Sequence, residues 1–442
     1  MRIFSKIFGR NSSHTLDPNI GFGRYSDSYK TDEKYDFWDK SVLEFENKHY
    51  HNSYKLFFEY LKDIDEKNVF IIDQGNSLEF TIFQGSKKIT GYTTDKKIFA
   101  ESKIARIMDK HIGFLRKLVE MNFNLRFSRF ALDKENNITM VFNSFLLDTS
   151  PYKLYYALKE LSTSSDKQDD ILIKEFGGLQ PVNTGHLRPI KSKEKETKFN
   201  FLIHEVQDSI KEYEEGKLNT INFPGGISYF LLSKMYKLDY LLKPEGKTMA
   251  SFEKIHMKFF TNNGEGPHEK NKQIVKELKK ISRTRREDFD KELYEVLSTF
   301  GVTAPTSHRQ YITFADSELS KMDWYMDNKH PKIARSIPDY IVGYSLFNYA
   351  LPAPLKKLLH CYYEILEPAF FKALEYNLNL RKGQTLNQQA IKKRILATAK
   401  IYNEEYPHYS PNVKMLDFTN DVLFSKSFIQ MTRELNLTKI SR

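Results

Sequence analysis

Residues 122–168 read NFNLRFSRFALDKENNITMVFNSFLLDTSPYKLYYALKELSTSSDKQ. Apolar and polar side chains alternate on both sides of the polar stretch DKENN, and this period of two predicts two β-strands joined by a turn. The alternation changes phase near residues 128–129, where a β-bulge is expected. Ser150 followed by Pro151 favours a helix start, and aromatic and leucine residues then recur at helical spacing. The stretch therefore predicts a strand, a turn, a second strand and a helix.

The residues around this stretch extend the same pattern. Apolar periodicity predicts helices at residues 35–50, 52–63 and 100–121, strands at 69–72, 78–83 and 89–93, and a further helical piece at 169–176 that ends at Gly177 and Gly178. Strand meanders separated by helices are typical of an α+β fold rather than a doubly wound sheet. We therefore expect an N-terminal antiparallel sheet with flanking helices, preceded by a turn-rich lead-in at residues 1–34.

The segment QPVNTGHLRPIKSKEKETK at residues 180–198 contains two prolines, a glycine and a charged tail, and predicts a linker. Beyond it the strand signal fades. Helices are expected at residues 199–215, 227–242, 247–260, 268–283, 286–300, 317–326, 337–349, 354–378 and 387–406, with Pro368 kinking or splitting the long one. The sequence thus predicts an α+β domain at 35–179 and an all-α domain at 199–442.

The composition allows a large core and leaves the purpose of the many aromatic residues open. Aromatic residues make up 14% of the 442 residues, and they suit either ordinary core packing or a protein-binding surface. The net charge is +11. Residues 1–190 carry 28 Lys and Arg against 26 Asp and Glu, whereas the remainder carries 40 against 31. An anionic partner is therefore to be sought in the C-terminal part.

Several classes of protein find no support in the sequence. The single cysteine, Cys361, excludes an internal disulfide and a cysteine-cluster zinc site, and its neighbours favour a buried apolar thiol. His49 and His51 stand at a turn without a nearby third ligand. No metal or other cofactor is expected. No apolar run is long enough for a signal peptide or a membrane span, so we expect a soluble cytoplasmic protein. The first ten residues, MRIFSKIFGR, could form one basic amphipathic turn, but their shortness favours a frayed or docked tail.

Catalytic motifs are also missing. The glycines at 225–226 and 264–266 match neither phosphate-binding pattern, and neither G-x-S-x-G nor H-E-x-x-H occurs. No catalytic residue can be assigned, and we expect a protein that is not an enzyme.

The strongest charge feature is HEKNKQIVKELKKISRTRR, which begins at His268. As a helix it would present one basic stripe and one apolar stripe, the basic one made of Lys272, Lys276, Lys279, Lys280 and Arg283. Such a helix could bind nucleic acid, an acidic membrane or an acidic protein. The ordinary alternative is a solvated face backed by a core stripe. Smaller clusters at residues 392–394 and at Arg116, Arg126 and Arg129 carry the same two interpretations.

In element order, the N-terminal domain resembles the type III secretion chaperone-like fold and, within it, the YbjN-like proteins. The residues that carry the resemblance are LEFTIFQGSKKITGYTT at 78–94, KIARIMDKHIGFLRKLVEMNFNLRFSRFALD at 103–133 and ITMVFNSFLLD at 138–148. The resemblance implies a compact α+β module, often dimeric, that binds other polypeptides and has no catalytic residues. The chain departs from the small, acidic secretion chaperones because it is long and basic and has a large helical half.

Together these observations favour a non-enzymatic cytoplasmic protein-binding module or adaptor that binds other proteins at a sheet edge, a sheet face or a helical groove. Such a module could form a homodimer. The alternative is nucleic-acid or anionic-surface binding through the basic helix.

Overall fold

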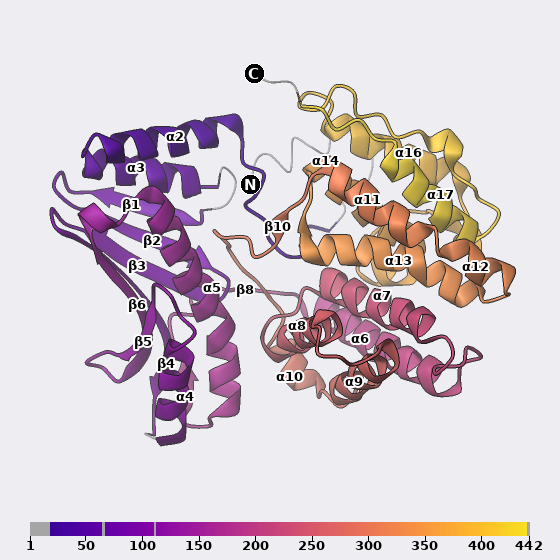
Figure 1. Ribbon diagram of the computed structural model, residues 1–442, viewed down its shortest axis with the longest axis horizontal. Coiled ribbons are helices and arrows are strands. Elements are labelled where there is room, and N and C mark those ends of the chain that lie inside the picture. The colour runs from indigo at the N-terminus through magenta and orange to yellow at the C-terminus, as the bar shows by residue number, and fades with distance from the viewer. Residues whose placement is uncertain (1–17, 64–66, 110–111, 440–442) are drawn as a thin grey trace. The chain divides into compact units, whose positions relative to one another are not determined.

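The computed structural model describes residues 18–63, 67–109 and 112–439. The chain divides into a sheet unit, Tyr25–Pro189 with Tyr294–Val302, and a helical unit, the described parts of Met1–Arg24, Ile190–Leu293 and Thr303–Arg442. An antiparallel sheet near the N-terminus is followed mostly by helices (Figure 1), which confirms the α+β class. The amphipathic turn expected in the first ten residues lies outside the described part of the chain.

The sheet unit is built on one antiparallel sheet. Its strands are β1 (Val69–Asp73), β2 (Leu78–Gln84), β3 (Lys87–Thr93), β4 (Lys97–Ile107), β5 (Arg129–Leu132) and β6 (Asn137–Phe145), in the order β1-β2-β3-β4-β6-β5, and β7 (Leu179–Pro181) pairs with the end of β4. Its helices are α2 (Asp32–Glu46), α3 (Tyr50–Leu61), α4 (Ile112–Asn122) and α5 (Pro151–Glu175). The helical hairpin, the first three strands and the helix start at Pro151, where the Ser150 hydroxyl accepts the Lys153 N–H, agree with the expectations from sequence.

Helices α3 and α5 cover one face of the sheet. Alternate residues of β2 and β3 point toward them, so that Leu78, Phe80, Ile82 and Ile89 are buried. They pack with aromatic residues of α3 and leucines of α5, namely Tyr54, Phe57, Phe58, Leu154, Leu158 and Leu161. A second core lies where α4 and the C-terminal part of α5 meet β4, β5 and β6. Helices α3, α4 and α5 therefore pack on one side of the sheet.

The helix expected at residues 100–121 is wrong in its first half. Residues up to Ile107 form β4, and the helix α4 begins only at Ile112. Along β4, Ile98, Ala100, Ser102 and Ile104 are buried and alternate with more exposed residues, which is the period of a strand. In the sheet, β4 lies between β3 and β6 and forms backbone hydrogen bonds with both strands. This pairing outweighs the helical spacing of the isoleucines.

The first strand expected in the stretch at 122–168 is confirmed only from Arg129 to Leu132, as β5. Residues 123–128 are not part of a strand, so the β-bulge expected near residues 128–129 is wrong. The carboxylate of Glu160 on α5 accepts hydrogen bonds from three consecutive backbone N–H groups, those of Arg126, Phe127 and Ser128, at 2.8–2.9 Å. Backbone donors that converge on one carboxylate cannot alternate between two neighbouring strands. Burial opposes ionisation of Glu160, but these hydrogen bonds together hold its pKa below the usual value. Helix α5 itself is continuous, so residues 169–176 are its last turns rather than a separate piece.

The segment Tyr294–Val302 belongs to the sheet unit, although a helix was expected at residues 286–300. Helix α10 (Arg286–Asp290) stops early, and β9 (Tyr294–Glu295) then pairs with β8 (Arg188–Pro189). The side-chain oxygen of Gln84 accepts the backbone N–H groups of Thr299 and Phe300, and the Phe300 ring enters the core beside α3 and α5. The expected continuous domain at 199–442 is therefore interrupted by a return to the sheet unit.

The helical unit surrounds a nearly wholly buried helix, α7 (Pro224–Leu242). Helices α6 (Ser192–Glu215), α8 (Gly246–Phe260), α9 (Pro267–Ile281) and α13 (Pro331–Asn348) pack against it. The unit also contains α10 and the helices α11 (His308–Leu319), α12 (Met322–Asp327), α14 (Ala353–Leu366), α15 (Pro368–Ala373), α16 (Gln388–Ile401) and α17 (Asp421–Arg433). Residues 192–198 of the expected linker are helical, because α6 begins at Ser192. Pro368 separates α14 from α15, as expected for a residue without a backbone donor.

Candidate functional site

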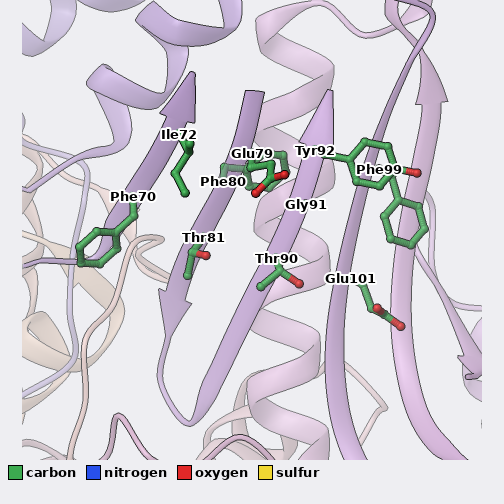
Figure 2. A pocket seen from close by; sticks show the side chains of 10 residues that line it. All are labelled: Phe70, Ile72, Glu79, Phe80, Thr81, Thr90, Gly91, Tyr92, Phe99 and Glu101. Atoms are coloured by element: carbon green, nitrogen blue, oxygen red, sulfur yellow. The ribbon is translucent and has the colours of Figure 1, made fainter. Parts of the chain in front are cut away.

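The open face of the sheet, turned away from α3 and α5, carries a hollow of about 390 Å³. Residues of β1, β2, β3 and β4 line it: Phe70, Ile72, Glu79, Phe80, Thr81, Thr90, Gly91, Tyr92, Phe99 and Glu101. Figure 2 looks onto this face, with α5 behind the strands and the side chains of Ile72, Tyr92 and Glu101 standing in front of them. The hollow is therefore a surface of the sheet unit alone.

Strand register arranges these side chains in two rows across the sheet. One row is Ile72, Glu79, Tyr92 and Phe99, and the other is Phe70, Thr81, Thr90 and Glu101. Directly opposed residues on one face of a sheet lie close enough for their side chains to interact. Each row thus combines apolar or aromatic groups with one carboxylate.

Strand β3 carries a glycine behind the hollow, on the side of the sheet that faces the helices. Gly91 stands opposite Phe80 in the β2–β3 pair. A Cβ atom at Gly91 would lie 2.2 Å from the Phe80 ring and 2.3 Å from the carbonyl oxygen of Phe99. The Phe80 ring therefore occupies, on the helix-facing side of the sheet, the place that a side chain at Gly91 would take.

The apolar part of the open face is aromatic and partly exposed. The rings of Tyr92 and Phe99 stack with centroids 5.5 Å apart, and Phe70 meets Phe83 edge-on at 6.1 Å. Phe70 and Ile72 are 46% and 60% exposed. Large apolar side chains grouped in this way on a surface are typical of a protein contact.

Two carboxylates interrupt this apolar surface. Glu79 accepts a hydrogen bond from the Gln74 side chain at 3.0 Å. Glu101 is partly buried, and within residues 18–63, 67–109 and 112–439 its carboxylate has neither a hydrogen bond nor an ion pair. With strands about 4.8 Å apart and a rise of about 3.3 Å per residue, the register places the two carboxylates about 12 Å apart. The open face can therefore receive positively charged groups at two points.

Sequence reasoning placed part of this site and missed the rest. Glu79 and Thr81 were expected to share one face of a strand, and they do. Glu101 fell within the expected helix at 100–121 and so was assigned to no sheet. The alternation of Phe99, Glu101 and Lys103 with Ala100 and Ser102 was the signal that could have placed it.

The structure places all five predicted basic-stripe residues on one helix and its end. Lys272, Lys276, Lys279 and Lys280 lie on α9 and Arg283 just beyond it, and all five are exposed. The apolar stripe of the same helix, Ile274, Val275, Leu278 and Ile281, is buried in the core of the helical unit. Helix α9 therefore has an exposed basic side and a buried apolar side, as the sequence predicts.

Carboxylates balance three of these five cations. Lys272 pairs with Glu269 at 2.8 Å, Lys279 with Glu214 at 2.5 Å and Lys280 with Glu277 at 3.1 Å. Lys276 and Arg283 have no carboxylate partner in the described part of the chain. The free positive charge of the stripe is therefore smaller than the sequence suggests.

The cysteine, the two histidines and two of the arginines singled out from the sequence are either buried or paired with carboxylates. Cys361 is fully buried, which raises the pKa of its thiol and makes it unreactive. His49 bonds to Glu44 and His51 to Asp73, on separate carboxylates. Arg394 pairs with the buried Glu364 at 2.5 Å, and Arg116 pairs with Glu120 at 3.0 Å.

Among the described residues there is no group of three or more His, Cys, Asp or Glu that could hold a metal ion. Over the same residues, no helix combines the length and the apolar character needed to cross a membrane. Comparison with models of known protein families and with curated proteins gives no match.

Proposed function

We propose that the chain is a non-enzymatic, cytoplasmic protein-binding module, and that the open face of its sheet binds an extended polypeptide segment. The observation that carries the proposal is the partly buried Glu101, a carboxylate without a partner beside the aromatic side chains of an uncovered sheet. A carboxylate in such a place is stabilised when a basic side chain reaches it. The segment therefore carries both apolar and basic residues.

The spacing of the site indicates the pattern of the segment. Residues four apart in an extended chain point to the same side about 13 Å apart, close to the separation of about 12 Å between Glu79 and Glu101. A side chain midway between them would face Thr90 and Tyr92. Lysines four apart with valine between them match this arrangement.

The resemblance to the chaperone-like fold supports the same proposal. The sheet unit runs α2, α3, β1 to β4, α4, β5, β6 and α5, which is the element order on which the resemblance rests, with one strand added. Under this proposal the sheet unit is a YbjN-like polypeptide-binding domain. Its edge strand β1, which pairs only with β2 among the described strands, offers a second place for an extended segment.

The test measures binding of a fluorescein-labelled probe peptide with the core sequence Lys-Thr-Val-Thr-Lys to the full-length protein. Wild type should bind it, and Glu101→Lys should weaken binding at least about tenfold, since the substitution replaces an attractive charge by a repulsive one. Fluorescence anisotropy gives the dissociation constants.

Two controls accompany this measurement. Glu46→Lys makes the same change of charge at an exposed position of α2, outside the lining of the hollow, and should leave binding unchanged. A peptide with glutamate in place of both lysines should not bind. Equal affinity of wild type and Glu101→Lys for the lysine peptide would refute the proposal.

A second candidate, binding of an anionic partner through α9, is favoured by the two exposed cations without carboxylate partners, Lys276 and Arg283. The probe is a short double-stranded RNA. Lys276→Glu with Arg283→Glu should lower its affinity and reduce the slope of log K against log salt by about 2, one for each cation lost. Lys272→Glu, which removes a cation already paired with Glu269, should change the slope less. An unchanged slope in the double variant would exclude this candidate.

A further inference from the structure

Helix α4 presents an apolar ridge that the open face of the sheet does not include. The ridge consists of Ile112, Val119 and Phe123, which are 84%, 71% and 93% exposed. Phe123 follows the last residue of the helix, and its N–H continues the turn by donating to the Glu120 carbonyl. Spacings of seven and four residues bring the three side chains onto one side of the helix.

This ridge is not the side by which α4 is held in the fold. Phe114 and Leu118 are buried and pack in the core formed with β4, β5 and β6. They lie on the opposite side of the helix from Ile112, Val119 and Phe123. The helix is therefore apolar on two sides, and only one of them serves the packing of the sheet unit. Figure 1 shows α4 at one end of the sheet.

The charges around the ridge are mostly positive. From Arg106 to Arg126 the described charged residues are four cations, Arg106, Arg116, Lys117 and Arg126, and two carboxylates, Asp109 and Glu120. All six are exposed. Arg116 pairs with Glu120 at 3.0 Å, and Lys117 has no carboxylate partner among the described residues, so the unpaired charge of α4 is positive. This contrasts with the open face, where the unpaired charge is negative. The two surfaces of the unit therefore suit partners of opposite charge.

We propose that the ridge docks on an anionic lipid surface. Ile112, Val119 and Phe123 enter the boundary between headgroups and acyl chains, and Arg116 and Lys117 meet the anionic headgroups. An apolar crest with cations beside it is the arrangement by which helices lie on membranes. A convex row of three side chains fits a medium that can deform around it, and the excess of cations selects acidic lipids.

Sedimentation with vesicles tests this on the full-length protein. Vesicles with about 30% phosphatidylserine in phosphatidylcholine should carry wild type down at about 0.15 M salt, and pure phosphatidylcholine should carry down much less. The triple variant Ile112→Ser, Val119→Ser and Phe123→Ser, here called the ridge variant, should reduce binding to acidic vesicles at least about tenfold. Arg116→Glu with Lys117→Glu should reduce it also. The control variant Leu43→Ser, Leu147→Ser and Ile221→Ser removes similar exposed apolar area elsewhere and should leave binding unchanged.

A tryptophan at the ridge separates insertion from attraction of charge alone. In a protein with Trp38 and Trp324 replaced by phenylalanine, Phe123→Trp should show a blue-shifted emission with acidic vesicles only. No binding to acidic vesicles, equal binding by the ridge variant, or an unshifted tryptophan would each overturn the proposal. So would a wild-type dimer in light scattering that the ridge variant converts to monomer, because a second copy of the chain would then cover the ridge.

Discussion

Gly85→Ala is expected to lower the free energy of unfolding of the sheet unit by about 2–4 kcal/mol, the sum of backbone strain and a lost hydrogen bond. Gly85 opens the turn between β2 and β3 with φ of +54°, a conformation that an L-residue adopts only with strain. A Cβ atom there would lie 1.9 Å from Asp166 Oδ1. The substitution thus forces both the turn and helix α5 to adjust.

The Asp166 carboxylate cannot move away without cost. Its Oδ1 accepts the Ser86 N–H at 2.6 Å. Beside it, Asp169 accepts the Ser86 hydroxyl and pairs with the fully buried Lys87, each at 2.6 Å. Burial, together with the charge of Asp169, raises the pKa of Asp166 to about 7. Displacing Asp166 would leave the Ser86 N–H without its acceptor in a half-buried place.

Gly75→Ala is the matched control. Gly75 also has a positive φ, +82°, but a Cβ there would meet no atom within 4 Å. It should therefore cost only the backbone strain, about 1 kcal/mol. Chemical denaturation of the full chain gives both values when Trp324 is replaced by phenylalanine, which leaves Trp38 in the sheet unit as the one tryptophan. Equal losses for the two variants would show that Asp166 does not hold the turn.

Local sequence signals predicted those parts of the fold where short-range and long-range forces agree. Strands β2 and β3 alternate cleanly, and α5 begins at a serine and a proline that suit a helix start, so these elements could be placed. The stretch that became β4 contains Ile104 and Ile107, which fit a helix as well as a strand. Only its two neighbouring strands decide between them.

Other features depend on residues far apart in the chain. The loop at Arg126–Ser128 is set by Glu160, and the return segment is held by Gln84, more than two hundred residues before it. No local pattern contains such a contact. The candidate site could not be predicted in full for the same reason. Glu101 belongs to the open face only because β4 is a strand that pairs with β3. The basic stripe was placed correctly on α9, but the carboxylates that balance it include Glu214 from another helix.

Lys237→Met is expected to destabilise the helical unit by about 3–5 kcal/mol, because it leaves the half-buried Glu367 without a cation and the buried Glu205 with one lysine instead of two. Lys237 lies on α7, and its Nζ is 2.6 Å from Glu205 of α6 and 2.7 Å from Glu367 at the end of α14. Its side chain is only 7% exposed. Burial alone would lower the pKa of Lys237, but the charges of Glu367 and Glu205 outweigh it and raise the pKa. Methionine fills similar space and removes the charge alone.

Lys332→Met provides the same substitution in a solvent-exposed ion pair. Lys332 pairs with Glu212 of α6 at 2.6 Å, and its side chain is 48% exposed. Water screens such a pair, so the loss should be at most about 1 kcal/mol. Denaturation followed through Trp324, with Trp38 replaced by phenylalanine, reports on the helical unit.

A double variant separates the loss of the ion pairs from the loss of the cation–π contact with Phe201. If the cost of Lys237→Met comes from the unpaired carboxylate of Glu367, adding Glu367→Gln should restore part of the stability, because a neutral amide is cheaper to bury than a charge. Glu205 retains Lys234 at 2.8 Å and so needs no replacement. If the second substitution only adds to the loss, the lysine acts through the cation–π contact of its Nζ with the Phe201 ring, whose centroid is 5.4 Å away. In that case the ion pairs of α7 would contribute little to the stability of the helical unit.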